Sequence, residues 1–342
     1  MCGGGVEHKA PFPHLPTRNT MHQTCSVWIF FVGMVGVLGG AWPLAASPIA
    51  VQPADPASPF TVRFGNHTIS ASVMAVTVMP GDTVPVSVEG RDASSSYRIE
   101  APTNTTTWTP GDTPWSFTAP DAPGLYPLVV HGADDASVQL QVFVLEPWDH
   151  DGTYLDGYRI GRYESEPRRG LETYERPEGF IRVTKETRTT QVAPHFRLEQ
   201  FLCKQTDGLP QFVLLDTHLL QLLEDVLATV RERGHSVPTL HIMSGFRTPH
   251  YNRSIGNTTV YSRHLYGDAA DIFVDATGNA RMDDLTDTGR VTEADAELLA
   301  DIVEAVKDAN GDAYVGGMGV YGPAPHRGPF VHVDLRGQRA RW

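Results

Sequence analysis

The stretch SRHLYGDAAD, residues 262–271, places His264 seven positions before Asp271, and Asp271 belongs to an apolar run. A second histidine, His332, stands far downstream in FVHVD, residues 330–334. Two imidazoles and one carboxylate form a ligand set that suits Zn²⁺ and leaves one coordination position open. An open position is typical of a catalytic metal and not of a structural one. We therefore predict that these three residues bind zinc.

The surroundings of Asp271 support a functional interpretation. The run Ala269–Val274 is predicted to be a strand, and Gly267 allows a tight turn before it. A carboxylate in an apolar strand is costly unless it is paired or bound to a metal. In the last predicted strand, His332 and Asp334 alternate with apolar residues and therefore share one face.

Composition limits the possible partners. A chain of 342 residues has room for about two domains of ~100–200 residues. The hydrophobic fraction of 41% and the charged fraction of 20% are those of a globular protein. The formal net charge of −13 argues against nucleic acid or an anionic membrane surface as a partner. The three cysteines form no cluster that would suit a structural zinc site.

Residues 1–47 resemble an export signal. No charged residue occurs between Asn19 and Ala54, and Val27–Leu38 is an apolar core of the length that a secretory signal needs. Small residues that permit cleavage follow, but the apolar stretch is also long enough to be an uncleaved membrane anchor. Both interpretations predict an exported protein, located in the periplasm or cell envelope, and the second attaches it to the inner membrane.

Composition shifts divide the rest of the chain. Residues 48–58 are a Pro/Ala-rich linker. Residues 59–147 contain short alternating runs bounded by turn residues, which predict an all-β, immunoglobulin-like antiparallel sandwich with the role of a spacer or of a wall-binding module. Residues 148–192, rich in charge, tyrosine and glycine, are predicted to be a connector that packs on a domain surface. The second domain then covers residues 193–342.

Within the second domain, periodicity predicts the main elements. Residues 214–234 carry the apolar stripe of an amphipathic helix that ends at a glycine, and residues 240–243 form a strand. A second helix is expected over residues 294–307, preceded by a capping arrangement. The glycine-rich run 316–322 is predicted to be a strand that another backbone segment approaches closely.

Arg247 directly follows the strand 240–243 in the sequence SGFRT. A guanidinium group offers a planar fork that holds a carboxylate through two hydrogen bonds. Arg247 is therefore a candidate to bind the terminal carboxylate of a peptide. The alternative is a structural arginine that pairs with a nearby acid.

These motifs together resemble a known family. The pattern S-x-H-x-x-G-x-A-x-D, the later H-x-D and the earlier SGFRT are similar to the zinc D-alanyl-D-alanine carboxypeptidase and dipeptidase family, in particular its periplasmic murein-peptidase branch, over about residues 194–342. The resemblance implies an α+β peptidase domain with a small antiparallel sheet, shared with hedgehog signalling domains. It also implies Zn²⁺ bound by His264, Asp271 and His332, and substrate contacts from Arg247 and Ser262.

The sequence departs from this family at one position. Several members have a catalytic glutamate three residues before the last histidine ligand, where this chain has Pro329. The candidates for the catalytic base are then His326 and Asp334, although a carboxylate so close to a ligand histidine more often orients its imidazole.

The resemblance implies a zinc metallopeptidase that hydrolyses peptidoglycan stem or cross-link peptides, as a carboxypeptidase or an endopeptidase. Peptidoglycan peptides are then the expected partner. Because the usual glutamate is missing, a non-catalytic, zinc-containing peptidoglycan-binding or scaffold protein is the alternative.

Overall fold

The computed structural model describes residues 57–89, 97–101, 115–205 and 208–342, which belong to one compact unit. The segment 1–47, predicted to be a signal or anchor, lies outside these residues. In the described part of the chain, no helix has the length and apolar character needed to cross a membrane. Export of the protein therefore stays a prediction.

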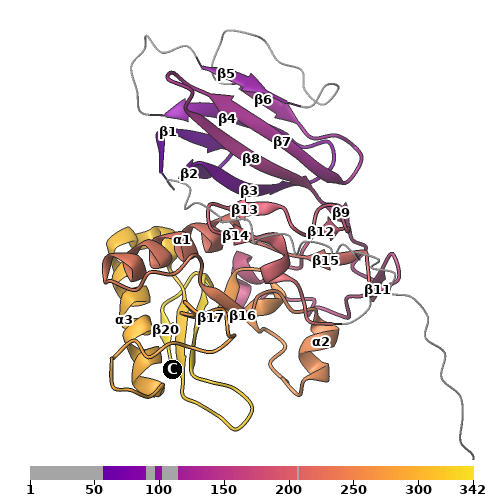
Figure 1. Ribbon diagram of the computed structural model, residues 1–342. Coiled ribbons are helices and arrows are strands. Elements are labelled where there is room, and N and C mark those ends of the chain that lie inside the picture. The colour runs from indigo at the N-terminus through magenta and orange to yellow at the C-terminus, as the bar shows by residue number, and fades with distance from the viewer. Residues whose placement is uncertain (1–56, 90–96, 102–114, 206–207) are drawn as a thin grey trace, which may run out of the picture. The chain divides into compact units, whose positions relative to one another are not determined.

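The first eight strands form two four-stranded sheets around a shared apolar core (Figure 1). One sheet has the order β2-β1-β4-β6 and the other β3-β8-β7-β5. The short runs predicted from alternation are thus strands, but β3 and β8 pair in parallel, so a purely antiparallel arrangement was wrong. The likeness to an immunoglobulin domain stays a prediction. The strands are β1 (Ala57–Phe64), β2 (His67–Ala71), β3 (Val73–Val78), β4 (Thr83–Glu89), β5 (Arg98–Glu100), β6 (Trp115–Thr118), β7 (Gly124–His131) and β8 (Ser137–Val144).

The predicted connector packs against the C-terminal part of the chain. Its Tyr163 is buried and donates a hydrogen bond of 2.7 Å to the carbonyl of Leu265, next to His264. Within the connector, β12 pairs with β9, which directly precedes the connector, and with β15, which follows it. The short elements of this region are β9 (Glu146–Pro147), β10 (Tyr154–Leu155), β11 (Tyr158–Arg159), η1 (Arg168–Gly170), η2 (Glu172–Tyr174), β12 (Gly179–Val183) and β15 (Gln211–Val213).

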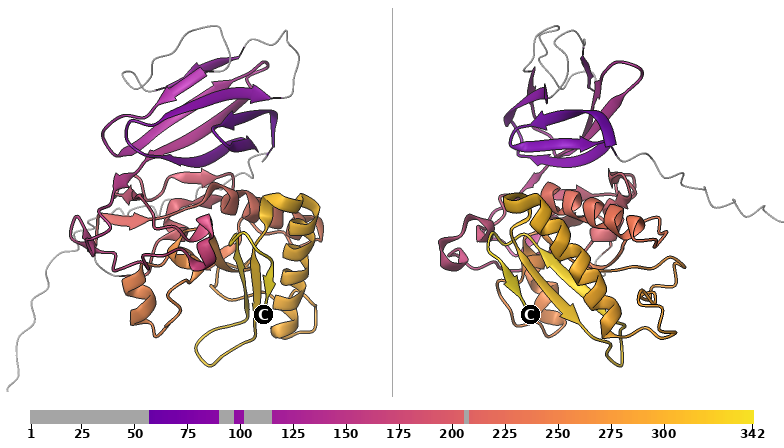
Figure 2. Two further views of the ribbon diagram at one scale, coloured as in Figure 1. Left: turned by 180° about the vertical axis from the view of Figure 1, so that it is seen from behind. Right: turned by 90° about the vertical axis from the view of Figure 1, so that its left-hand side faces the viewer.

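A five-stranded sheet with the order β16-β17-β19-β18-β20 forms the centre of the C-terminal part. Its pairs are antiparallel except for β18 and β20, which run parallel, so the predicted small antiparallel sheet is confirmed for the four longer strands. In Figure 2, α3 lies across this sheet, and α3 also packs against α1. The elements are β16 (His241–Ser244), β17 (Ala269–Phe273), β18 (Gly317–Tyr321), β19 (Phe330–Asp334), β20 (Ala340–Arg341), α1 (Thr217–Glu232), α2 (Pro249–Ser254) and α3 (Glu293–Asn310).

Local signals explain where the helices begin and end. The carboxylate of Asp216 accepts hydrogen bonds from two backbone N–H groups at the start of α1, and Gly234 follows its end with φ +96°. Thr292 and Asp295 form the capping box predicted for α3. The remaining elements are β13 (Gln191–Ala193), β14 (Phe196–Arg197), η3 (Leu198–Phe201), η4 (Arg263–Leu265) and η5 (Gly311–Tyr314).

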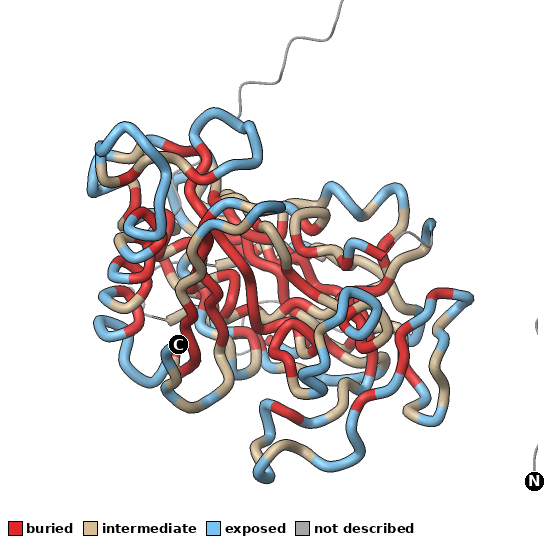
Figure 3. The backbone as a smooth tube through the Cα atoms, turned by 90° about the horizontal axis from the view of Figure 1, so that it is seen from below, coloured by how far each residue is buried: buried red, intermediate tan, exposed pale blue. Residues whose placement is uncertain are grey.

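Every residue of β17 and β19 is buried. Figure 3 shows such buried strands in the interior, surrounded by half-buried and exposed loops. Three ionisable residues, Asp271, His332 and Asp334, therefore sit in strands with at most 6% of their surface exposed. Each of them needs a partner inside the protein, because an unpaired buried charge is costly.

Gly267 is required by the turn that leads into β17. Its φ is +77°, and a Cβ at this position would lie 2.5 Å from the carbonyl carbon of Leu214. We expect Gly267→Ala to lower the free energy of unfolding by about 3 kcal/mol or more, because strain and a backbone clash add. Gly278→Ala is the matched control, since Gly278 has φ +69° but open space around it, and should cost about 1 kcal/mol. Equal losses in urea or thermal unfolding would contradict the packing argument.

Candidate metal centre

Two neighbouring strands and one short helical turn bring the predicted ligands together. Asp271 on β17 lies directly opposite His332 on β19 in their antiparallel register. Side chains at such opposite positions start only about 5 Å apart at Cβ. His264 lies on η4, and the turn at Gly267 returns the chain into β17 beside it.

The three side chains converge on one point. Oδ1 of Asp271 lies 2.8 Å from Nδ1 of His332 and 3.2 Å from Nε2 of His264. The two imidazole rings are 4.9 Å apart between centroids and nearly perpendicular. One ligand atom from each of the three residues lies within 4.8 Å of the other two, and all three residues are buried. These separations suit donors gathered around a single ion.

The second nitrogen of each imidazole has an acceptor of its own. Nδ1 of His264 lies 2.7 Å from the carbonyl oxygen of Gly245, and Nε2 of His332 lies 3.0 Å from Oδ2 of Asp334. These acceptors place a proton on the outer nitrogen of each ring and leave the inner nitrogen to face the cluster. Metal-binding histidines are held in this way in proteins. The donor set therefore fits a metal such as zinc.

Residues 194–303 match the Peptidase M15 family. The match confirms the resemblance to zinc D-alanyl-D-alanine carboxypeptidase-like proteins for this segment of the chain and supports a metallopeptidase, while the periplasmic branch stays a prediction. The matched segment includes His264 and Asp271 but ends before His332, which the sheet brings to them. No curated protein and no solved structure was found to match the chain.

Behind the cluster of His264, Asp271 and His332, the side chain of Asp334 is surrounded by donors. Besides the ring of His332, its carboxylate accepts hydrogen bonds from the Nε of Arg336 at 2.9 and 3.1 Å and from the backbone N–H of Gly317 at 2.8 Å. Asp334 is fully buried, and its backbone carbonyl also accepts a bond from Lys307. A carboxylate with this many partners fits the orienting role and not that of a catalytic base.

Arg247 contacts the cluster itself. Its Nη2 donates to Oδ2 of Asp271 at 2.7 Å, and its Nε donates to the hydroxyl of Ser244 at 2.8 Å. The side chain of Arg247 is only 15% exposed. The contacts are those of the alternative considered from the sequence, an arginine paired with a nearby acid, and they hold the second oxygen of Asp271 away from the imidazoles.

The electrostatics of the three ligands differ. Burial tends to raise the pKa of Asp271, but His264 and His332 hold it well below its ordinary value, so the residue is a carboxylate. Burial lowers the pKa of His264, which is therefore neutral near pH 7. Burial also acts to lower the pKa of His332, but its hydrogen bonds to Asp271 and Asp334 outweigh this and raise it to about 9. In the absence of a metal, His332 thus carries the proton of the cluster.

A cavity of about 460 Å³ opens onto the cluster of His264, Asp271 and His332. The predicted substrate residue Ser262 lines it, as do His264, Asp271, His332 and Arg247. The other lining residues are mainly basic, aromatic or small and polar: Arg168, Asn257, Thr259, Tyr261, Arg263, Tyr321, Arg327, Phe330, Arg336 and Trp342.

The two candidates for the catalytic base do not line this cavity. His326 is exposed in the loop between β18 and β19, and Asp334 lies behind His332. Pro329, which stands at the position of the family glutamate, is buried. Apart from the ligands themselves, the lining contains no carboxylate or imidazole.

Sequence reasoning missed the other arginines of the cavity. Arg263 lies inside the quoted motif. Its buried guanidinium lies over the rings of Tyr174 and Tyr266, 4.1 and 4.6 Å from their centroids, and pairs with Asp268. Its position beside His264 was a signal that could have been used. Arg327 offered no comparable signal, because it stands in a loop without regular spacing.

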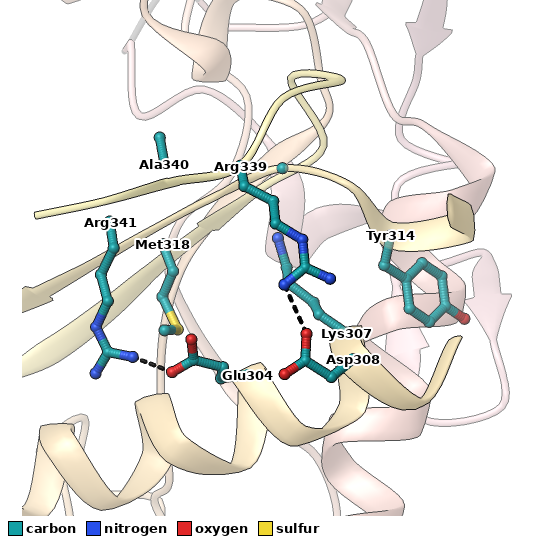
Figure 4. A pocket seen from close by; sticks show the side chains of 9 residues that line it. Glu304, Lys307, Asp308, Tyr314, Met318, Arg339, Ala340 and Arg341 are labelled. Atoms are coloured by element: carbon teal, nitrogen blue, oxygen red, sulfur yellow. Dashed lines mark hydrogen bonds and ion pairs between the residues drawn. The ribbon is translucent and has the colours of Figure 1, made fainter. Parts of the chain in front are cut away.

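A second pocket, of about 210 Å³, lies between α3 and the edge of the C-terminal sheet and has no predicted site residue in its lining. Figure 4 shows that ion pairs cross it, from Arg339 to Asp308 and from Arg341 to Glu304. These pairs link β20 and its preceding turn to α3. We therefore interpret this pocket as part of the scaffold.

Metal binding should depend on pH, because zinc must displace the proton of His332. Below a pKa of about 9 this imidazole is protonated in the metal-free protein, so the apparent zinc affinity should rise about tenfold per pH unit from pH 7 toward 9. The affinity should then level off. Competition with a chromophoric chelator at fixed ionic strength measures this dependence, and an affinity that is flat over this range would contradict it.

The orienting role of Asp334 predicts a defined effect on metal affinity. Asp334→Asn keeps the shape of the side chain but weakens the acceptor that holds His332, so the zinc affinity should fall about 10- to 100-fold. His326→Ala is the matched control, since the exposed imidazole contacts none of the ligands, and its zinc affinity should equal that of the wild type. Equal affinities in all three proteins would show that the contact to Asp334 is dispensable.

Proposed function

We propose that this protein is a zinc-dependent peptidase that hydrolyses stem or cross-link peptides of peptidoglycan in the cell envelope. The observation that carries the proposal is the convergence of His264, Asp271 and His332 on one point, with the outer nitrogen of each imidazole already bonded. The match of residues 194–303 to Peptidase M15 supports hydrolysis of a peptide bond. The apolar, uncharged segment 19–54 supports export, which would bring enzyme and peptidoglycan into one compartment.

When bound, zinc would polarise a carbonyl group and lower the pKa of a bound water toward ~7. The chain's own residues hold the ligands in place. The carbonyl of Gly245 and the carboxylate of Asp334 fix the two imidazoles, while Arg247 fixes Asp271. A set of ligands held by such partners does not have to rearrange when a substrate arrives.

Proton transfer in this cavity needs a group other than the family glutamate. Tyr321 lines the cavity, and its hydroxyl accepts a hydrogen bond of 2.7 Å from the indole of Trp342. Because the oxygen of Tyr321 is the acceptor in this bond, its own proton stays available to a bound peptide. We assign Tyr321 as a donor to the substrate.

The second candidate is a non-catalytic, zinc-containing protein that binds peptidoglycan. Pro329 in place of the glutamate and the exposed position of His326 favour it, because neither offers a base to the cavity. The two candidates differ in one respect that can be measured: the enzyme releases fragments, whereas the binding protein is retained on the wall without cleaving it.

Incubation of the zinc-loaded protein with isolated sacculi separates these candidates. We expect release of peptides that a chelator abolishes and zinc restores, and at least a 1,000-fold lower rate for His264→Ala because a metal ligand is lost. His235→Ala, which removes a histidine outside the cavity, should cleave at the wild-type rate. Saturable binding without any released peptide would instead establish the second candidate.

A further inference from the structure

Two of the five arginines that line the cavity have no acidic partner among the described residues. They are Arg168 and Arg327, and neither takes part in an ion pair. The other three are each paired with one aspartate: Arg247 with Asp271, Arg263 with Asp268, and Arg336 with Asp334. The cavity therefore has more positive than negative side chains, in a protein whose net charge is −13. A concave site with charge opposite to that of its protein concentrates anionic ligands.

Ring contacts and the hydrogen bonds of one nitrogen hold the side chain of Arg327 in place, so some of its N–H donors stay unused by the described residues. Its guanidinium lies over the rings of Phe330 and Tyr321, 4.7 and 5.7 Å from their centroids, and these two rings stack at 4.5 Å. Its Nη1 donates to the carbonyls of Gly322 and Gly328 at 2.7 and 3.3 Å. In the described part of the chain, Nε and Nη2 have no hydrogen-bond acceptor. A fixed guanidinium with two free donors is prepared for a carboxylate.

Arg327 and the three candidate ligands line the same cavity. The guanidinium of Arg327 lies over the ring of Phe330. Phe330 and His332 are two residues apart on one strand and so project from the same face of the sheet. Two strand residues span about 7 Å. Arg327, which lies over the ring of Phe330, therefore shares its cavity with the candidate ligands on the neighbouring part of the same sheet, where a peptide bound at the cluster can meet it.

On the basis of the proposed function, we propose that Arg327 binds the free terminal carboxylate of the substrate and makes the enzyme a carboxypeptidase. This assigns to Arg327 the role expected from the sequence for Arg247, which is occupied by Asp271 and Ser244. A peptide without a free carboxylate at this end would leave Arg327 unpaired, which costs binding free energy.

A pair of matched peptides tests this assignment. Both carry the same blocked N-terminal part and end in D-alanyl-D-alanine, one as the free acid and one as the C-terminal amide. The zinc-loaded full chain should cleave the acid with a kcat/KM at least about 10- to 100-fold higher than the amide, the range for a lost charge-assisted contact. Arg327→Gln should remove this preference by slowing cleavage of the acid and leaving that of the amide within about twofold. Arg327→Lys should fall between the two.

The control variant is Arg281→Gln, which removes the same charge from an exposed position outside the cavity and should keep the full preference for the acid. Zinc content and melting temperature are measured for each variant, so that a folding defect is recognised. The assignment is overturned if the wild type cleaves acid and amide alike, if Arg327→Gln slows both equally, or if only Arg168→Gln removes the preference.

Calorimetric binding of the two peptides separates this inference from the proposed function. If the wild type cleaves neither peptide but binds the acid about 10- to 100-fold more tightly than the amide, and Arg327→Gln abolishes this difference, the peptidase fails while the carboxylate site stands. If neither peptide is cleaved and both are bound equally or not at all, both proposals are rejected.

Discussion

The carboxylate of Asp271 lies between two imidazoles and one guanidinium. The arrangement of the C-terminal part depends on giving this buried charge its hydrogen-bond partners. Its strand is buried, and only the cavity side of Asp271 can reach solvent, so the charge needs partners within the protein. One oxygen faces His264 and His332, and the other receives a hydrogen bond from Arg247. β16, η4, β17 and β19 must all be in place before these partners meet. The cost of burying Asp271 therefore couples the candidate metal centre to the sheet that carries it.

Buried charges around the centre occur as matched pairs. Asp334 faces Arg336, and Asp268 faces Arg263 with the rings of Tyr174 and Tyr266 above it. Such pairs add little net stability, because the cost of removing two charges from water offsets their attraction. Removing one partner of such a pair is strongly destabilising, because it leaves the other charge buried without a partner. We interpret the pairs as devices that fix side-chain positions, which a metal site with narrow geometric limits requires.

Much of the local structure could be predicted from the sequence, because its signals are short-range. The apolar stripe of α1, the capping box of α3 and the strands that carry the ligands follow from periodicity and from the chemistry of individual residues. Asp271 and His332 were found because acids and histidines are rare in apolar strands, and His264 because it stands in the motif that leads into the first of these strands. The parallel pairing of β3 with β8 could not be predicted, since alternation gives no information about strand direction.

The parts of the site that were not predicted depend on contacts across the fold. Arg247 follows a strand and left two roles open, a substrate clamp or a partner of a nearby acid, and only the pairing of β16 with β17 shows that the acid is Asp271. Arg327 gains its position from the stacked rings of Tyr321 and Phe330, residues that are neighbours only through the β18–β19 pairing. Side-chain partners of this kind are set by tertiary register, which a single sequence does not show.

Two glycines, Gly316 directly before β18 and Gly319 within it, influence the geometry of the candidate metal centre although they have no side chain. A Cβ on Gly316 would lie 1.8 Å from the carbonyl oxygen of Asp334, and one on Gly319 would lie 2.5 Å from the indole nitrogen of Trp342. A single added methyl group at Gly316 would push β19 outward and carry the imidazole of His332 with it. The geometry of the candidate metal site is thus constrained as strictly by missing side-chain atoms as by the donor atoms, and variants that leave every polar residue intact can still displace a ligand.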